Sequence, residues 1–124
     1  MEFCPGGHLF DHISGLARRK ERLDRASAVA TMEQIAAAVR VLHHHQPPIA
    51  HRDLKLENVL LGPGGRCKLC DFGSCAMGPQ SVAGAPERSA AEEVIEKNTT
   101  QAYRAPEMCD LYSVKTLDEA VDVW

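Results

Sequence analysis

The most regular pattern of apolar positions lies in residues 26–44. Large apolar side chains recur there at steps of three and four residues, which places them on one face of a helix. The residues between them are largely Ala, Glu, Gln and Arg, which favour helices, and two prolines after His45 end the pattern. We therefore predict a helix over residues 26–44 with a buried apolar stripe. The stripe consists of Met32, Ile35, Val39 and Leu42.

Shorter patterns predict a second helix and one β-hairpin. Residues 9–16 have the spacing of a short helix. Residues 59–61, Val-Leu-Leu, and residues 66–70, Arg-Cys-Lys-Leu-Cys, flank the turn residues 62–65, Gly-Pro-Gly-Gly, and this arrangement is typical of two antiparallel strands.

Residues 74–91 differ from the rest of the chain. They are rich in Gly, Ala, Ser and Pro, and their only large apolar side chains are Met77 and Val82. We expect such a segment to bury too little surface to offset its ordering entropy. Residues 90–97, which follow, are predicted to form a short acidic helix.

Composition and charge exclude several classes of protein. A chain of 124 residues is one small domain at most, or a piece of a larger one. A net charge of −3 gives no reason to expect nucleic acid or an anionic membrane as a partner. No apolar run is long enough to span a bilayer and no signal peptide is present, so we predict a cytoplasmic location.

The five cysteines favour free thiols over a disulfide framework, because their number is odd and no secretory signal accompanies them. Cys67 and Cys70 have the spacing of half a zinc site or of a redox pair. We favour a plain strand leading into Asp71, since no second Cys pair or suitably spaced His pair follows.

Residues 43–45 are three consecutive histidines, a tract that can bind metal. They also lie at the end of the predicted helix, where His complements the helix dipole. We favour the second interpretation, a solvated helix end.

The strongest candidate for chemistry is the segment of residues 51–58, His-Arg-Asp-Leu-Lys-Leu-Glu-Asn. Asp53 and Asn58 are five positions apart, a spacing that suits a base beside an attacking hydroxyl and an amide oxygen on Mg²⁺. Lys55 can reach a transferring phosphate, and Asp71 offers a second Mg²⁺ ligand.

The ordered motifs resemble those of the eukaryotic protein kinases. H-R-D with an Asn five residues on is followed by D-F-G at residues 71–73 and by A-P-E at residues 105–107. The resemblance implies an α+β fold: part of the large, C-terminal lobe of a kinase, mainly helical, with a small β-hairpin carrying the catalytic loop and D-F-G.

The resemblance also implies that residues 1–124 are one piece of a kinase catalytic domain, running from the hinge to the activation segment and the start of the helices that follow it. Its parts would be a hinge (1–7), a helical part (8–50), the catalytic loop, hairpin and D-F-G (51–73), the activation segment (74–107) and the start of the following helices (108–124).

The resemblance implies a role for each motif residue. Asp53 would accept the proton of a substrate hydroxyl, and Lys55 would neutralise the moving phosphoryl group. Asn58 and Asp71 would hold Mg²⁺. Arg52 would pair with a phosphate in the activation segment, for which Ser74, Ser81, Ser89 and Thr99 are all candidates.

ATP would bind at the hinge. The backbones of Glu2 and Cys4 would pair with adenine, Leu60 would form the adenine floor, and Met1 would be the gatekeeper.

Two further positions complete the resemblance. Thr100 would bond the catalytic Asp and Lys, a feature of serine/threonine kinases that the Lys at position 55 also fits. Asp122 would brace the backbone of the catalytic loop.

The sequence around A-P-E resembles the Numb-associated kinases, which include the adaptor-associated and cyclin-G-associated kinases. Residues 92–100, 103–108 and 110–113 carry this likeness, together with Cys4 and Ser74. It implies endocytic, clathrin-linked adaptor proteins as substrates and a peripheral place at endocytic membranes.

The chain also departs from the kinase pattern. It contains neither the glycine-rich loop nor the lysine that holds the phosphates, and both of its ends cut through elements that the pattern carries whole. We therefore expect a truncated piece that alone neither transfers phosphate nor folds stably. Two classes stay open: a serine/threonine kinase, favoured by intact Asp53, Asn58 and Asp71, and a non-catalytic module that binds kinase partners or adaptor proteins, favoured by the missing small lobe.

Overall fold

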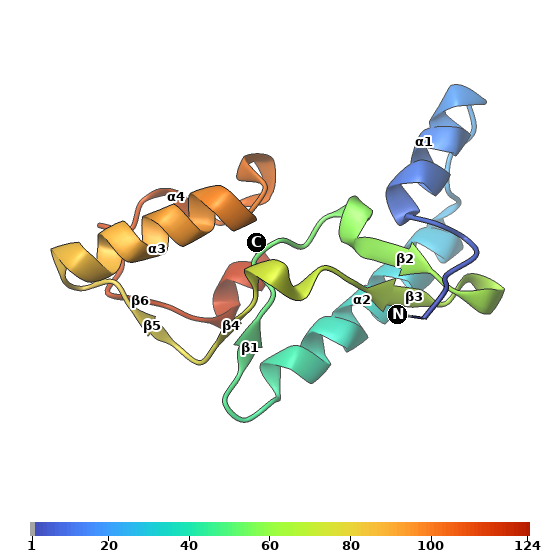
Figure 1. Ribbon diagram of the computed structural model, residues 1–124. Coiled ribbons are helices and arrows are strands. Elements are labelled where there is room, and N and C mark those ends of the chain that lie inside the picture. The colour runs from blue at the N-terminus through green and yellow to red at the C-terminus, as the bar shows by residue number, and fades with distance from the viewer. Residues whose placement is uncertain (1) are drawn as a thin grey trace. The chain divides into compact units, whose positions relative to one another are not determined.

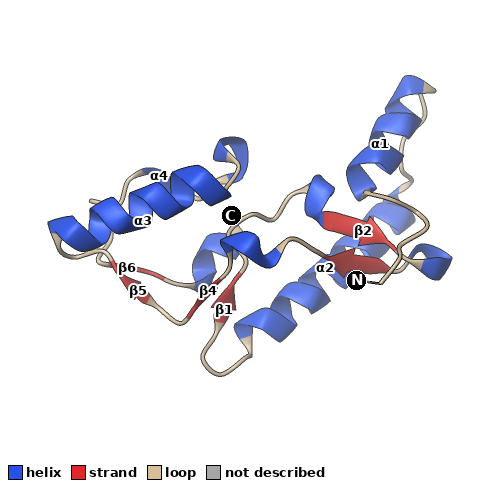
Figure 2. Cartoon of the chain, viewed as in Figure 1, coloured by secondary structure: helices blue, strands red, loops and turns tan. Residues whose placement is uncertain are grey.

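The structure is a computed structural model that describes residues 2–124; the predicted gatekeeper, Met1, lies outside them. The chain is mainly helical with small two-stranded antiparallel sheets, as an α+β fold requires (Figure 2). It divides into two compact units. The first unit contains the residues up to Arg40 and Lys55–Asp71, and the second contains Val41–Leu54 and Phe72–Trp124.

The predicted helices and hairpin are confirmed (Figure 1). The helices are α1 (Leu9–Arg18) and α2 (Arg25–His43). Strands β2 (Val59–Leu61) and β3 (Cys67–Leu69) pair antiparallel within the first unit, with Val59 opposite Leu69. The turn between them needs its glycines, because Gly64 and Gly65 have φ angles of 70° and 74°.

The prediction that the apolar stripe of α2 is core was wrong for Met32, whereas Ile35, Val39 and Leu42 are half-buried. Met32 is 62% exposed, and none of the described residues of α2 is fully buried. The first unit buries only two large apolar side chains among its described residues, Leu9 and Val59, so it offers little apolar surface to cover the stripe. A hydrogen bond ties the helix to the hairpin, in which the Cys67 N–H donates to Gln34 Oε1 at 2.9 Å.

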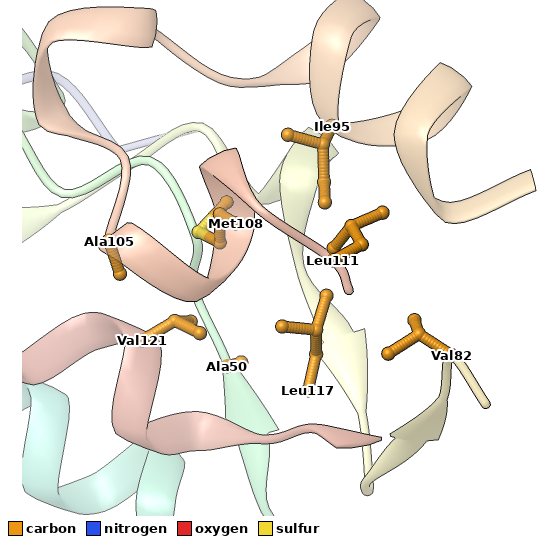
Figure 3. Close-up of a cluster of buried hydrophobic side chains, with 8 residues drawn as sticks. All are labelled: Ala50, Val82, Ile95, Ala105, Met108, Leu111, Leu117 and Val121. Carbon is orange, nitrogen blue, oxygen red and sulfur yellow. The ribbon is translucent and has the colours of Figure 1, made fainter. Parts of the chain in front are cut away.

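The hydrophobic core lies in the second unit (Figure 3). Its side chains come from strand β1 (Ile49–Ala50), helix α3 (Ala85–Asn98), helix α4 (Pro106–Cys109), strand β6 (Thr116–Leu117) and the loops between. The eight buried members are Ala50, Val82, Ile95, Ala105, Met108, Leu111, Leu117 and Val121.

The segment of residues 74–91 is ordered, contrary to the prediction. Strand β4 (Ala76–Met77) pairs with β1, and strand β5 (Gln80–Ser81) pairs with β6. Helix α3 begins at Ala85, five residues before the predicted start at 90, with a proline in its first turn. Backbone pairing of this kind needs no large side chains, and Val82, 0% exposed, inserts directly into the core.

The burial of Val82 predicts a measurable loss of stability. Val82→Ala should lower the free energy of unfolding by about 2 kcal/mol, because it removes two buried methyl groups and leaves a cavity. The matched control is Val94→Ala on α3, where the side chain is 45% exposed and little change is expected. Urea denaturation followed by circular dichroism, with both variants carried in a longer kinase chain that contains these 124 residues, measures the two effects, and equal stability of the two variants would show that Val82 is not part of a packed core.

Among the helices of residues 2–124, none has the length and hydropathy needed to cross a membrane.

Candidate active site

A buried carboxylate accepts hydrogen bonds from the backbone at the start of the segment of residues 51–53. The N–H groups of His51 and Arg52 donate to the two oxygens of Asp122, each at 2.7 Å. His51, Arg52 and Asp53 are all at least 94% buried, and Arg52 has a φ of 69°. A left-handed φ at a non-glycine residue is costly, so these two charge-assisted hydrogen bonds stabilise the turn. The predicted bracing role of Asp122 is confirmed.

His43 joins the same carboxylate. Its Nε2 lies 2.9 Å from Asp122 Oδ2, and its side chain is only 17% exposed. The prediction of a solvated helix end was therefore wrong for His43, although His44 and His45 are exposed. The two partners lie 79 residues apart, and no local pattern indicates such a contact.

The residues after Asp71 pack against the catalytic loop within the second unit. Ser74, itself buried, donates its hydroxyl to the His51 carbonyl at 2.6 Å. The rings of His51 and Phe72 lie with centroids 5.5 Å apart and an interplanar angle of 52°. From the sequence, Ser74 was a marker of the family and a candidate phosphorylation site, and its contact with His51 was not predicted.

Thr100 orients the carboxylate of Asp53. Its backbone N–H donates to Asp53 Oδ1 at 2.9 Å. Thr100 follows Thr99, whose hydroxyl donates to the Ile95 carbonyl at 2.7 Å and accepts from Arg104 Nε at 2.8 Å. These bonds of Thr99 fix the C-terminal end of α3. The predicted link between Thr100 and Asp53 is present through the backbone of Thr100.

Arg52 is a buried cation. Burial lowers the pKa of its guanidinium, and the nearby Asp122 carboxylate opposes that shift. Its Nη2 donates to Gln80 Oε1 at 3.0 Å. Its Nε is buried without a hydrogen-bond partner among residues 2–124. This side chain therefore has capacity for a further acceptor.

Asn58 and Asp71 lie at the open end of the hairpin in the first unit. Asn58, 5% exposed, accepts a hydrogen bond on its carbonyl from the Cys70 N–H at 3.0 Å, and Asp71 follows directly. Asp71 has a φ of 60°, a conformation that Asp tolerates better than most residues. The two side chains thus leave neighbouring strands with oxygen donors, which fits the ligand preference of Mg²⁺.

Lys55 precedes this pair in the chain. Its carbonyl accepts the Asn58 N–H at 3.0 Å, and its side chain is half-buried. Lys55, Asn58 and Asp71 belong to the first unit, whereas Arg52, Asp53 and Thr100 belong to the second. In the first unit, backbone hydrogen bonds join Asn58 to Lys55 and to Cys70, which precedes Asp71. In the second unit, the Thr100 N–H binds Asp53, which follows Arg52.

The predicted adenine-binding residues lie along the hairpin. Two backbone hydrogen bonds of 2.9 Å join the residues at Gly6 and Gly7 to Leu61, next to Leu60. Glu2 forms an ion pair with Lys68 of β3, and the Cys4 carbonyl accepts the Gly7 N–H at 3.2 Å.

All five cysteines are free thiols. Burial raises the pKa of Cys67, and burial followed by the charges of Asp71 and Cys4 raises the pKa of Cys70. Both thiols therefore carry less thiolate at neutral pH than an ordinary cysteine.

Comparison with known proteins gives one consistent result. The sequence profile of the protein kinase domain matches residues 1–124. The chain is 46% identical over 125 residues to a probable serine/threonine-protein kinase of Dictyostelium discoideum and 42% identical over 125 residues to serine/threonine-protein kinase ppk30 of Schizosaccharomyces pombe. It is 39% identical over 124 residues to actin-regulating kinase 1 of Saccharomyces cerevisiae.

These alignments cover 100% of this chain but 15%, 13% and 19% of the three relatives, respectively. The chain thus spans less than a fifth of the length of each of these relatives. Because the family profile matches from the first residue to the last, the chain belongs to the protein kinase domain family.

Proposed function

We propose that these residues form the catalytic-loop part of a serine/threonine protein kinase, which transfers the γ-phosphate of ATP to Ser or Thr hydroxyls of protein substrates. One observation carries the proposal beyond family membership. The carboxylate of Asp53 is buried, and it is held by a loop that Asp122 anchors and by the N–H of Thr100. A carboxylate preorganised in this way suits proton transfer.

In the proposed reaction the substrate hydroxyl oxygen attacks the γ-phosphorus as the bond to the departing ADP oxygen breaks. Asp53 orients that hydroxyl and accepts its proton. Lys55 neutralises charge on the moving phosphoryl group, and Arg52 and Thr100 keep Asp53 in place.

ATP and Mg²⁺ are the proposed cofactors. Asn58 and Asp71 would hold the metal, which supplies positive charge beside the phosphates when bound. The backbones of Glu2 and Cys4 would pair with adenine, and Leu60 would contact its face. The hydrogen bonds of Gly6 and Gly7 to Leu61 support this, because they keep the predicted hinge beside β2.

We further propose membership of the Numb-associated kinases, with endocytic adaptor proteins as substrates and a cytoplasmic location at endocytic membranes. The sequence pattern of residues 92–100, 103–108 and 110–113 supports it. Residues 92–98 form the last turns of α3, and Thr99 and Thr100 follow the helix.

The 124 residues alone are proposed to be inactive. They contain no glycine-rich loop and no upstream lysine to hold the phosphates, and the stripe of α2 is left partly exposed. The exposed part of this stripe, at Met32, supports the second candidate function, a non-catalytic module that binds other proteins through its activation segment.

A chimeric kinase separates these proposals. The segment of actin-regulating kinase 1 that aligns with this chain is replaced by these 124 residues. We expect ATP-dependent phosphorylation of Ser and Thr peptides, with none on Tyr peptides, and no transfer by the 124-residue chain alone. A chimera that folds as the parent does but transfers no phosphate would reject the kinase proposal and favour the binding module.

A further inference from the structure

Within residues 2–124, the side chain that accepts a hydrogen bond from the guanidinium of Arg52 is Gln80. Its Oε1 receives a hydrogen bond from Arg52 Nη2 at 3.0 Å, across 28 residues of sequence. Arg52 follows His51 and precedes Asp53, and its own N–H is bound to Asp122 at 2.7 Å. The Arg52 side chain is therefore a link between the catalytic loop and strand β5.

Gln80 is held in position independently of Arg52. It lies opposite Leu117 in the antiparallel pairing of β5 with β6, and Leu117 is 1% exposed. Two residues later the Val82 N–H donates to the Lys115 carbonyl at 2.9 Å, and Val82 is wholly buried. The backbone of Gln80 is thus held by pairing with β6 while its amide oxygen accepts from the guanidinium.

We propose that Gln80 is a positioning residue for the catalytic loop, and that its neutral amide takes the place at Arg52 that the kinase resemblance assigns to a phosphate. The loop is then held without phosphorylation of the activation segment. This inference rests on the proposed kinase function and concerns the regulation of the same site.

The chemistry of Arg52 supports this assignment. A buried guanidinium is costly unless acceptors satisfy its fork of donors. The amide of Gln80 satisfies one donor without any modification of the chain, whereas a phosphate does so only after phosphorylation.

Three of the four candidate phosphorylation sites, Ser74, Thr99 and Ser81, are less suited to this place. Ser74 and Thr99 already use their hydroxyls, on the carbonyls of His51 and Ile95. Ser81 neighbours Gln80 on β5, and alternation along a strand directs successive side chains to opposite faces. On β5 the side chain that reaches Arg52 is that of Gln80.

The test compares three substitutions in the chimeric kinase, Gln80→Leu, Gln80→Glu and Ser81→Ala. Gln80→Leu removes the acceptor at similar size and should lower kcat about tenfold, with KM for ATP within about twofold, since misplacement of a catalytic group affects turnover. Gln80→Glu restores an acceptor oxygen and should recover at least about half of the wild-type kcat. Ser81→Ala and prior treatment with a protein phosphatase should leave kcat unchanged.

Each outcome either supports or overturns the positioning role of Gln80. Wild-type turnover in Gln80→Leu would overturn the inference while the kinase function stands. Loss of activity in Ser81→Ala, or after phosphatase treatment, would show that a phosphate is the partner.

If the wild-type chimera transfers no phosphate, the kinase proposal fails and amide hydrogen exchange still tests the inference. Exchange of the Arg52 and Asp53 amides should be at least about threefold faster in Gln80→Leu than in wild type and unchanged in Gln80→Glu. Equal exchange in all three proteins would overturn it.

Discussion

Asp53→Asn should reduce kcat of the chimeric kinase by about 10²- to 10⁴-fold, which is the range that general-base catalysis contributes. Asn cannot accept a proton, but its amide oxygen can still accept the Thr100 N–H that now binds Asp53 Oδ1 at 2.9 Å. Stability and KM for ATP should therefore change little. Initial rates of phosphate transfer to a Ser peptide, at saturating ATP, measure the effect.

The matched control is Asp11→Asn, at an exposed position in the first turn of α1. It makes the same chemical change away from the proposed site, and full activity is expected. If Asp53→Asn retained more than about a tenth of the wild-type kcat, Asp53 would not be the base. A loss of activity accompanied by unfolding would instead assign Asp53 a structural role.

Asp122→Ala should cause the second large effect, a loss of both stability and activity. The side chain is 1% exposed and accepts the N–H groups of His51 and Arg52, with His43 Nε2 2.9 Å away. Its removal leaves these buried donors without their acceptor. We expect the free energy of unfolding to fall by about 3 kcal/mol, because each lost charge-assisted bond costs about 1.5–3 kcal/mol before relaxation.

Urea denaturation and turnover of the chimeric kinase measure the two effects. Asp122→Asn keeps one acceptor oxygen and should be intermediate in both. Asp118→Asn is the control, because that exposed side chain caps the Ala120 N–H through Oδ1 and Asn preserves this bond. Full stability of Asp122→Ala would contradict the anchoring role.

Local sequence patterns predicted the elements that short-range contacts form. The spacing of apolar residues located α1 and α2, and the two short segments around the turn Gly-Pro-Gly-Gly located the hairpin of β2 and β3. These features depend on periodicity and turn chemistry within a few residues, so a single sequence carries them. The motifs likewise identified Asp53, Asn58 and Asp71 as candidates before any geometry was known.

Resemblance to a family predicted two longer contacts that local pattern could not. Asp122 binds the backbone of Arg52 from 70 residues away. The Thr100 N–H binds Asp53 from 47 residues away. Periodicity has no information over such distances. These contacts were predicted only because the order of the motifs indicated which residues meet.

The tertiary structure decided the rest. Composition suggested that residues 74–91 could not fold, yet their backbone pairs with β1 and β6 and a single valine enters the core. His43 reaches Asp122, and Gln80 reaches Arg52, through contacts that no local signal indicates. The sequence by itself determined the helices, the hairpin and the candidate chemistry, because these depend on neighbouring residues. Burial and side-chain pairing were decided by the tertiary structure, because they depend on which distant segment supplies the partner.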